Sequence, residues 1–135
     1  MKFKFFAFFM GMLFMSSILG AKSSVDIDKD FYYGSGDLGL SLTDSAAVFK
    51  CWAPLAKSVK VLLFKDAENL SKPAKSLKMK KDSENPGVWI LEANTEGFSY
   101  YQYEIANPGK KSRVCDIWGK AASVDSQASQ IVDIN

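Results

Sequence analysis

Turn-forming residues divide most of this chain into short segments, and within these segments the side chains alternate between apolar and polar. The segment 38–43, LGLSLT, has leucine at every second position, which is the period of a strand with one buried face. The sequence NPG at 85–87 and again at 107–109 is a strong turn signal. Beyond the N-terminal residues, no segment keeps the 3.6-residue repeat of an amphipathic helix. The pattern predicts a protein built from β-strands.

Eight segments qualify as strands. They are residues 38–43, 47–53, 59–64, 75–80, 88–93, 100–106, 112–117 and, as a short final strand, 131–134. In the segment 75–80 lysines flank the apolar positions, which is typical of an edge strand protected against aggregation. Seven or eight short strands with a turn about every 8–12 residues predict an all-β sandwich.

The first 21 residues have the order of a secretory signal peptide. Two lysines lie within residues 1–4, the apolar run FFAFFMGMLFM follows at 5–15, and the small, weakly polar SSILGA occupies 16–21. This run is shorter than the ~20 residues that a membrane-spanning helix needs. We therefore expect cleavage near Ala21, a secreted or periplasmic product, and no stable membrane span after cleavage. Residues 22–30 are expected to form a flexible leader, and residues 31–135 the folded module.

Charge and composition exclude several classes of function. The chain has 17 Lys and Arg against 15 Asp and Glu, and the surplus of two is Lys2 and Lys4 of the signal segment. A mature chain without net charge is not expected to bind nucleic acid. The absence of histidine excludes a Ser-His-Asp triad, a Cys-His dyad and a histidine-ligated metal site. We expect no catalytic residue, no cofactor and no metal site in this chain.

The two cysteines, Cys51 and Cys115, allow two interpretations. Export to an oxidising compartment would permit a disulfide between them. Alternatively, each is a small buried apolar residue on its own strand. Sequence alone does not set the distance between their Cα atoms, so both interpretations remain open here.

The tryptophans are the most informative candidates for a binding surface. Alternation along 47–53 places Trp52 on the face opposite Phe49 and Cys51, so its ring is expected to be exposed or at an interface. Exposed tryptophan rings can stack on sugar faces, whereas the alternative role is packing in the core or against another domain.

Six short motifs occur in the order that is typical of the N-terminal domain of type I pullulanases. They are YGSGDLG at 33–39, FKCWAP at 49–54, PGVW at 86–89, YYQY at 100–103, VCDIWGKA at 114–121 and IVDI at 131–134. The chain from about Phe31 onward therefore resembles this domain, and Cys51 and Cys115 stand where the family has other apolar residues.

The resemblance implies an immunoglobulin-like (E-set) β-sandwich, classed as carbohydrate-binding module family 48. In the family this module precedes a glycoside hydrolase family 13 barrel that cuts α-1,6 branches. A catalytic barrel of about 250 residues does not fit in this chain, so we expect an accessory module that is inactive alone, the product of a truncated or split gene. The implied partners are an α-glucan (starch, glycogen or pullulan) or a glycoside hydrolase catalytic barrel.

The residues expected at a carbohydrate-binding or domain-interface site are Trp52, Trp118, Lys60 and Asp116. If the chain is a free-standing α-glucan-binding module, Trp52 and Trp118 are ring platforms, and Lys60 or Lys50 donates hydrogen bonds to sugar hydroxyls. Two alternatives stay open: a free-standing α-glucan-binding module, and a generic immunoglobulin-like interaction protein.

Overall fold

The computed structural model describes residues 24–133, so the expected signal peptide at 1–21 lies outside the described residues. One helical turn, α1 (Ile27–Asp30), precedes the strands. The strands are β1 (Gly39–Leu42), β2 (Ala47–Trp52), β3 (Ser58–Phe64), β4 (Lys75–Lys78), β5 (Lys80–Lys81), β6 (Val88–Ala93), β7 (Tyr100–Asn107), β8 (Lys110–Val114) and β9 (Ser129–Gln130). Within the described part of the chain no helix is long and apolar enough to cross a membrane.

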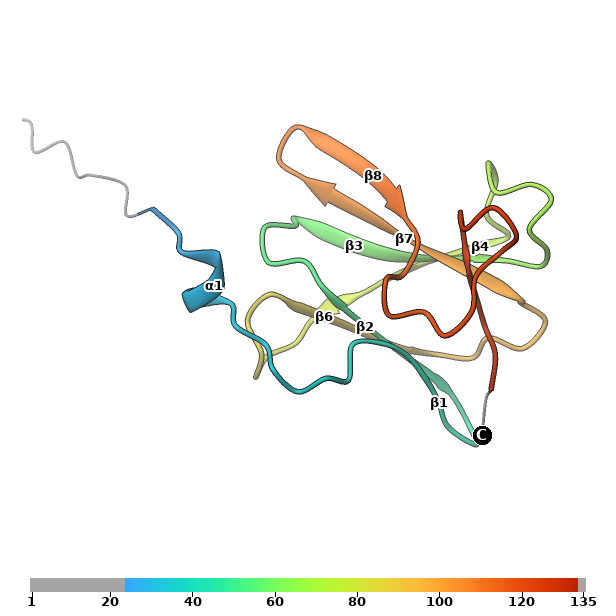
Figure 1. The fold of residues 1–135 in the computed structure, drawn as a ribbon, viewed down its shortest axis with the longest axis horizontal. Coiled ribbons are helices and arrows are strands. Elements are labelled where there is room, and N and C mark those ends of the chain that lie inside the picture. Colours follow the sequence, from blue (N-terminus) through green and yellow to red (C-terminus); the bar gives the residue numbers. More distant parts are fainter. Residues whose placement is uncertain (1–23, 134–135) are drawn as a thin grey trace, which may run out of the picture.

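The strands form two antiparallel sheets that lie one above the other (Figure 1). The first sheet has the order β1-β2-β6-β5 and the second the order β4-β3-β7-β8, with β9 pairing β7. The β7–β8 hairpin turns through Pro108 and Gly109. Proline fixes its own φ, and Gly109 takes a φ of 77°, which costs glycine little. This arrangement confirms the predicted all-β sandwich.

The core lies between the two sheets and follows the predicted alternation. Phe49 and Cys51 of β2 point inward from the first sheet, and Tyr101 and Tyr103 of β7 point inward from the second. The rings of Phe49 and Tyr101 meet edge to face across the core, with their centroids 5.1 Å apart. Because the side chains of a strand point alternately to its two faces, Trp52 is left outside the core, as predicted.

The leader predicted to be flexible, residues 22–30, contains the helical turn α1. Asp26 caps this turn: its side chain accepts a hydrogen bond from the backbone nitrogen of Lys29 at 3.3 Å. Acidic side chains at Asp28 and Asp30 are suited to the first turn of a helix. The structure thus places one capped helical turn, Ile27–Asp30, within the segment predicted as a flexible leader.

The segment predicted as one strand at 75–80 is divided between the two sheets. β4 pairs β3 in the second sheet, and β5 pairs β6 in the first. Met79 lies between them, buried in the core, and its backbone nitrogen donates to Val59 O at 2.9 Å. The alternating pattern predicted extended backbone correctly but not the change of sheet.

The last two predicted strands are displaced along the sequence. The strand expected at 112–117 runs from Lys110 to Val114, because Asp116 turns the chain out of the sheet through two bonds: Asp116 Oδ1 accepts from Trp118 N at 2.9 Å, and Asp116 O from Gly119 N at 3.0 Å. The final strand, expected at 131–134, is β9 at Ser129–Gln130. Ser129 is fully buried beside Asp116, and this contact sets where the strand lies.

Candidate functional site

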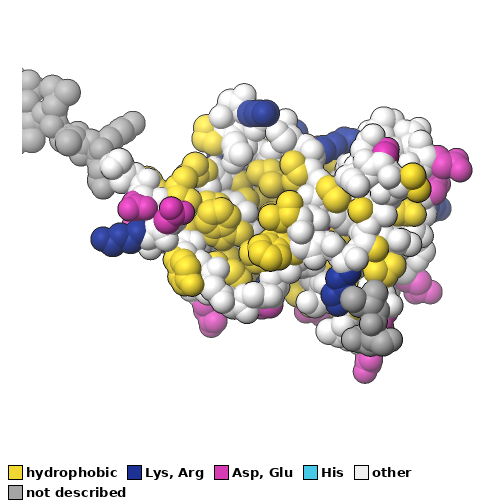
Figure 2. Space-filling model, viewed as in Figure 1, with side chains coloured by type: hydrophobic (Ala, Val, Ile, Leu, Met, Phe, Trp, Pro, Cys, Tyr) yellow, Lys and Arg dark blue, Asp and Glu magenta, His cyan; other side chains and the backbone are white. Residues whose placement is uncertain are grey.

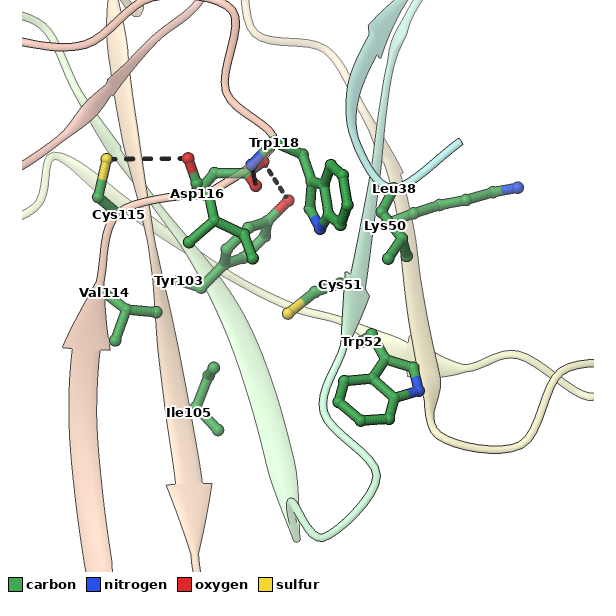
Figure 3. Close-up of a pocket in the computed structure, with 11 residues that line it drawn as sticks. Leu38, Lys50, Cys51, Trp52, Tyr103, Ile105, Val114, Cys115, Asp116 and Trp118 are labelled. Carbon is green, nitrogen blue, oxygen red and sulfur yellow. Dashed lines mark hydrogen bonds between the residues drawn. The ribbon is translucent and has the colours of Figure 1, made fainter. Parts of the chain in front are cut away.

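An apolar pocket of about 480 Å³ opens between the two sheets at the edge where β2 faces the β7–β8 hairpin. In Figure 3, Leu38, Lys50 and Trp52 line one side, while Ile105 and Val114 line the other. The loop that follows β8 closes the end of the pocket with Asp116, Ile117 and Trp118. Figure 2 shows hydrophobic side chains gathered around a hollow on the part of this face nearer α1.

Asp116 organises the floor of this pocket. Its Oδ2 accepts hydrogen bonds from the hydroxyls of Tyr101 and Tyr103, at 2.7 and 3.2 Å. Its backbone nitrogen donates to Ser129 Oγ at 2.9 Å. Burial, together with the charge of Asp116, raises the pKa of both tyrosines far above the ordinary value, so both stay protonated and donate. The carboxylate is thus a buried acceptor that holds the loop against the sheet.

The same carboxylate positions Trp118. Asp116 Oδ1 accepts from the backbone nitrogen of Trp118, and the Trp118 ring stands 56% exposed at the mouth of the pocket. Gly39 at the start of β1 packs beneath this loop with a φ of 98°. A Cβ at position 39 would lie 2.9 Å from the Cβ of Trp118. Only glycine leaves room for Trp118 here, which explains in physical terms the glycine of the motif at 33–39.

Trp52 is the second exposed tryptophan of the site and is 40% exposed. Its indole nitrogen donates to the carbonyl oxygen of Phe31 at 2.9 Å, so the chain that follows α1 fixes the ring. Trp52 also borders two neighbouring hollows of about 460 and 330 Å³. The larger of these is bordered by Trp118 as well, so the two rings belong to one continuous apolar surface.

A charged group forms part of the rim. Lys50 makes an ion pair with Asp37, and the hydroxyl of Tyr33 donates to the same carboxylate. The bond from Lys50, reinforced by that from Tyr33, lowers the pKa of Asp37 to about 2, and the carboxylate in turn raises the pKa of Lys50. Lys50 therefore stays a cation beside an otherwise apolar pocket.

Both cysteines line the pocket, and both are free. Burial, reinforced by the charge of Asp116, raises the pKa of Cys51 to about 12, so Cys51 is a neutral thiol and not a nucleophile. The Cys115 sulfur lies 3.0 Å from Ser129 Oγ and points away from Cys51 (Figure 3). The disulfide that the sequence allowed is not formed, because the two side chains are directed to different partners.

The four residues expected at the site are only partly brought together. Trp52, Trp118 and Asp116 line one pocket, with the tryptophans at its surface and Asp116 buried within it. Lys60 lies elsewhere, on the outer face of the second sheet, where its Nζ is 3.5 Å from Glu104 Oε1. Alternation along 59–64 places Val59 and Val61 inward and Lys60 outward. The same alternation could have shown from the sequence that Lys60 does not face the space between the sheets.

Sequence reasoning missed the aliphatic part of this surface. Ile117 is 88% exposed, Leu55 and Val114 are also exposed, and Leu38 and Ile105 lie half-buried between them. We call the surface formed by Leu38, Trp52, Leu55, Ile105, Val114, Ile117 and Trp118 the tryptophan surface. The exposure of Ile117 was missed because the predicted strand extended to residue 117, whereas β8 ends at Val114 and Ile117 lies in the turn after Asp116.

Comparison with known proteins finds the same module. The family model for carbohydrate-binding module 48 (isoamylase N-terminal domain) matches residues 37–119. A pullulanase from Klebsiella aerogenes is 30% identical over 104 residues, covering 72% of this chain and 9% of the relative.

Solved pullulanase structures match the fold. The pullulanase from Paenibacillus barengoltzii, in complex with maltohexaose and α-cyclodextrin, matches 79% of this chain and 16% of its own, with a TM-score of 0.72 and 28% identity. The pullulanase from Bacillus acidopullulyticus matches 76% of this chain and 12% of its own, with a TM-score of 0.68 and 31% identity. The chain thus spans less than a fifth of the length of these relatives.

Proposed function

The chain belongs to the carbohydrate-binding module 48 family, and from this membership we propose that it serves as an accessory module in pullulanase-type debranching of α-glucans. The observation that carries the proposal is the pair of exposed rings, Trp52 and Trp118, at the mouth of one pocket within the matched span. The similarity to the Klebsiella aerogenes pullulanase supports the assignment to α-1,6-glucan chemistry. The Paenibacillus barengoltzii relative forms a complex with maltohexaose, which supports an α-glucan as the ligand.

The pocket suits a glucan chain for a physical reason. A glucose ring has an apolar face and an equatorial rim of hydroxyl groups, so it needs both an aromatic contact and polar groups. Trp52 and Trp118 offer ring faces, and Lys50 at the rim offers a donor beyond its ion pair with Asp37. Asp116 contributes by holding Trp118 in place.

Affinity electrophoresis tests this proposal directly. The purified chain should migrate more slowly in gels that contain glycogen, amylopectin or pullulan than in plain gels. Trp52→Ala combined with Trp118→Ala should weaken retardation about tenfold or more, which corresponds to about 1.4 kcal/mol. Val25→Ala, a change at an exposed residue that does not line this pocket, is the matched control and should leave retardation unchanged. Equal migration of the unaltered chain in all gels would contradict glucan binding.

A second candidate is that the tryptophan surface docks on a glycoside hydrolase catalytic domain. The observation that favours it is the aliphatic share of the surface: Ile117, Leu55 and Val114 present no ring face to a sugar but suit the apolar centre of a protein interface. Ile117→Asp should then abolish co-elution with a pullulanase whose own module has been removed. Co-elution of the variant equal to that of the unaltered chain would reject docking through this surface.

We also propose that the protein acts outside the cytoplasm. The basic start, the apolar run at 5–15 and the small residues at 16–21 support this proposal. The mass of the chain recovered from the producing cells should correspond to a start at Lys22 or one residue earlier. A chain recovered only inside the cells, with Met1 retained, would contradict it.

A further inference from the structure

We propose that the protein has a second sugar-binding site, on the outer face of the second sheet and separate from the tryptophan surface. A pocket of about 610 Å³ opens there between β7, β8, the loop from β3 to β4 and the loop at 123–127. Its polar walls include Gln102, Arg113, Ser71 and Ser126. None of these four residues lines the pocket between the tryptophans, and Cys115 is the one residue that lines both pockets.

Gln102 supplies an acceptor that has no donor. The side chain is only 7% exposed, and its Nε2 donates to the carbonyl oxygen of Gln127 at 2.8 Å. That bond fixes which end of the amide carries the oxygen, because the opposite orientation would place two acceptors together. Gln102 Oε1 is consequently buried without a hydrogen bond to any described residue. A ligand that brings an O–H donor to this oxygen relieves the cost of leaving it unpaired.

Arg113 supplies donors next to this acceptor. Its Nη1 donates to the carbonyl oxygens of Leu70 and Ser71, at 3.2 and 2.9 Å, and its Nε lies 3.6 Å from Glu104 Oε2. These contacts hold the guanidinium in one orientation against the loop from β3 to β4. Nη2 has no partner among the described residues, so its N–H groups remain for a ligand.

An unpaired acceptor, Gln102 Oε1, next to the donors of Arg113 favours a ligand with hydroxyl groups. A fully ionised phosphate, sulfate or carboxylate could accept from Arg113 but has no proton to give to Gln102 Oε1. A hydroxyl both donates and accepts, so neighbouring hydroxyls of one sugar ring can satisfy Gln102 and Arg113 together. Leu70, half-buried in the same wall, gives the ring an apolar contact. Only the identity of the sugar, a glucose residue of an α-glucan, rests on the proposed function.

Access to the buried oxygen requires a small movement of one wall. Residues 124–127 are exposed, and Ser126 holds a φ of 57°, which is uncommon for a residue other than glycine. Gln127, the residue that Gln102 binds, belongs to the same loop. A hydroxyl that reaches Gln102 Oε1 therefore requires a shift of the exposed residues 124–126, while Gln127 O keeps its bond to Gln102 Nε2 and Arg113 keeps its bonds to Leu70 and Ser71.

Titration with maltoheptaose, followed by nuclear magnetic resonance, tests the proposal in the full chain. The side-chain amide signals of Gln102 and the Nε–H signal of Arg113 should shift with increasing sugar. They should shift equally in the variant with Trp52→Ala and Trp118→Ala, because the two sites are separate. Gln102→Leu should weaken the response of Arg113 at least tenfold, whereas Ser76→Ala, on the exposed edge strand β4, should leave it unchanged.

Three outcomes would overturn the second site. One is a shift of the indole signals of Trp52 and Trp118 without any shift at Gln102 and Arg113, which would leave the proposed function intact. Another is a larger response to inorganic sulfate than to maltoheptaose. The third is a crystal soaked in the sugar that shows only a water molecule at Gln102 Oε1. If Gln102 and Arg113 respond while the indoles do not, the second site stands and glucan binding at the tryptophan surface fails.

Discussion

At the scale of single residues, the exposed rings of the site are positioned by buried polar groups. Asp116 accepts from two tyrosine hydroxyls and from the nitrogen of Trp118, so one buried carboxylate sets the position of an exposed ring. Hydrogen bonds to a charged group contribute about 1.5–3 kcal/mol each, twice the usual value for neutral pairs. The aspartate is evident in the sequence, but its bonds to the two tyrosine hydroxyls, 15 and 13 residues away on β7, form only when the chain folds.

Gly39 provides a test of this positioning. Gly39→Ala should destabilise the protein by about 2–4 kcal/mol, because alanine resists the φ of 98° and its Cβ would press on Trp118. Tryptophan fluorescence should report a changed environment of Trp118 in the folded variant. Gly36→Ala is the matched control: its φ is 71°, but no atom lies within 4 Å of the added Cβ. Equal losses of stability in urea unfolding would show that contact with Trp118 contributes nothing.

Because of Cys51, the free energy of unfolding is expected to fall at alkaline pH. Its pKa is raised from the ordinary value of 9.0 to about 12 in the folded protein, so the folded state keeps a proton that the unfolded state loses. The contribution of the Cys51 thiol to the free energy of unfolding is therefore complete below pH 9 and is lost as the pH rises toward 12. The loss has a limiting slope of about 1.4 kcal/mol per pH unit.

Cys51→Val removes this titrating group while keeping a small apolar side chain. Between pH 9 and 11 the variant should lose less stability than the unaltered chain, by about 2–3 kcal/mol. Urea unfolding at a series of pH values measures the difference. Parallel curves for the two proteins would show that the Cys51 thiol does not titrate on unfolding in this range. Tyr101 and Tyr103, whose pKa values are also raised, contribute further alkaline loss in both proteins.

At the scale of elements, the strands follow from local sequence and the connections between sheets do not. Alternation located β1, β2, β3, β6 and β7 within one or two residues, because each buries one face against the core. β4 and β5 were predicted as one strand, since extended backbone is common to both and only the pairing partner changes at Met79. The end of β8 depends on the turn at Asp116, and the place of β9 depends on its first residue, Ser129, whose hydroxyl accepts from Asp116 N.

Met79 lies where the chain passes from the second sheet to the first, and its substitution tests how much packing there stabilises the sandwich. Met79→Ala should destabilise the protein by about 2–5 kcal/mol, because it leaves a cavity where the chain crosses between the sheets. Met79→Leu keeps the volume and should cost less than about 1.5 kcal/mol. Thermal and urea unfolding compare the two variants. If alanine costs no more than leucine, packing at the crossing does not hold the sheets together.

At the scale of the whole molecule, the sandwich is held by its core without a covalent link between the sheets. Cys51 belongs to the first sheet and Cys115 follows β8 of the second, and both are free. Titration with a thiol reagent under denaturing, non-reducing conditions should therefore find two thiols per chain. A result of no free thiols would show that the oxidised protein turns Cys115 away from Ser129 and toward Cys51.

Local sequence was enough to predict the fold class, the inward and outward faces of most strands, and the resemblance to the pullulanase module, which the family match confirms. Alternation and turn chemistry act within a few residues, so these properties can be read along the chain. The folded structure was needed to show that Trp52 and Trp118 share a pocket while Lys60 lies on another face. It was also needed to show that Asp116 is buried and that Gln102 keeps an unpaired oxygen. These properties arise from contacts between segments distant in the chain, and their geometry is set only when the two sheets pack.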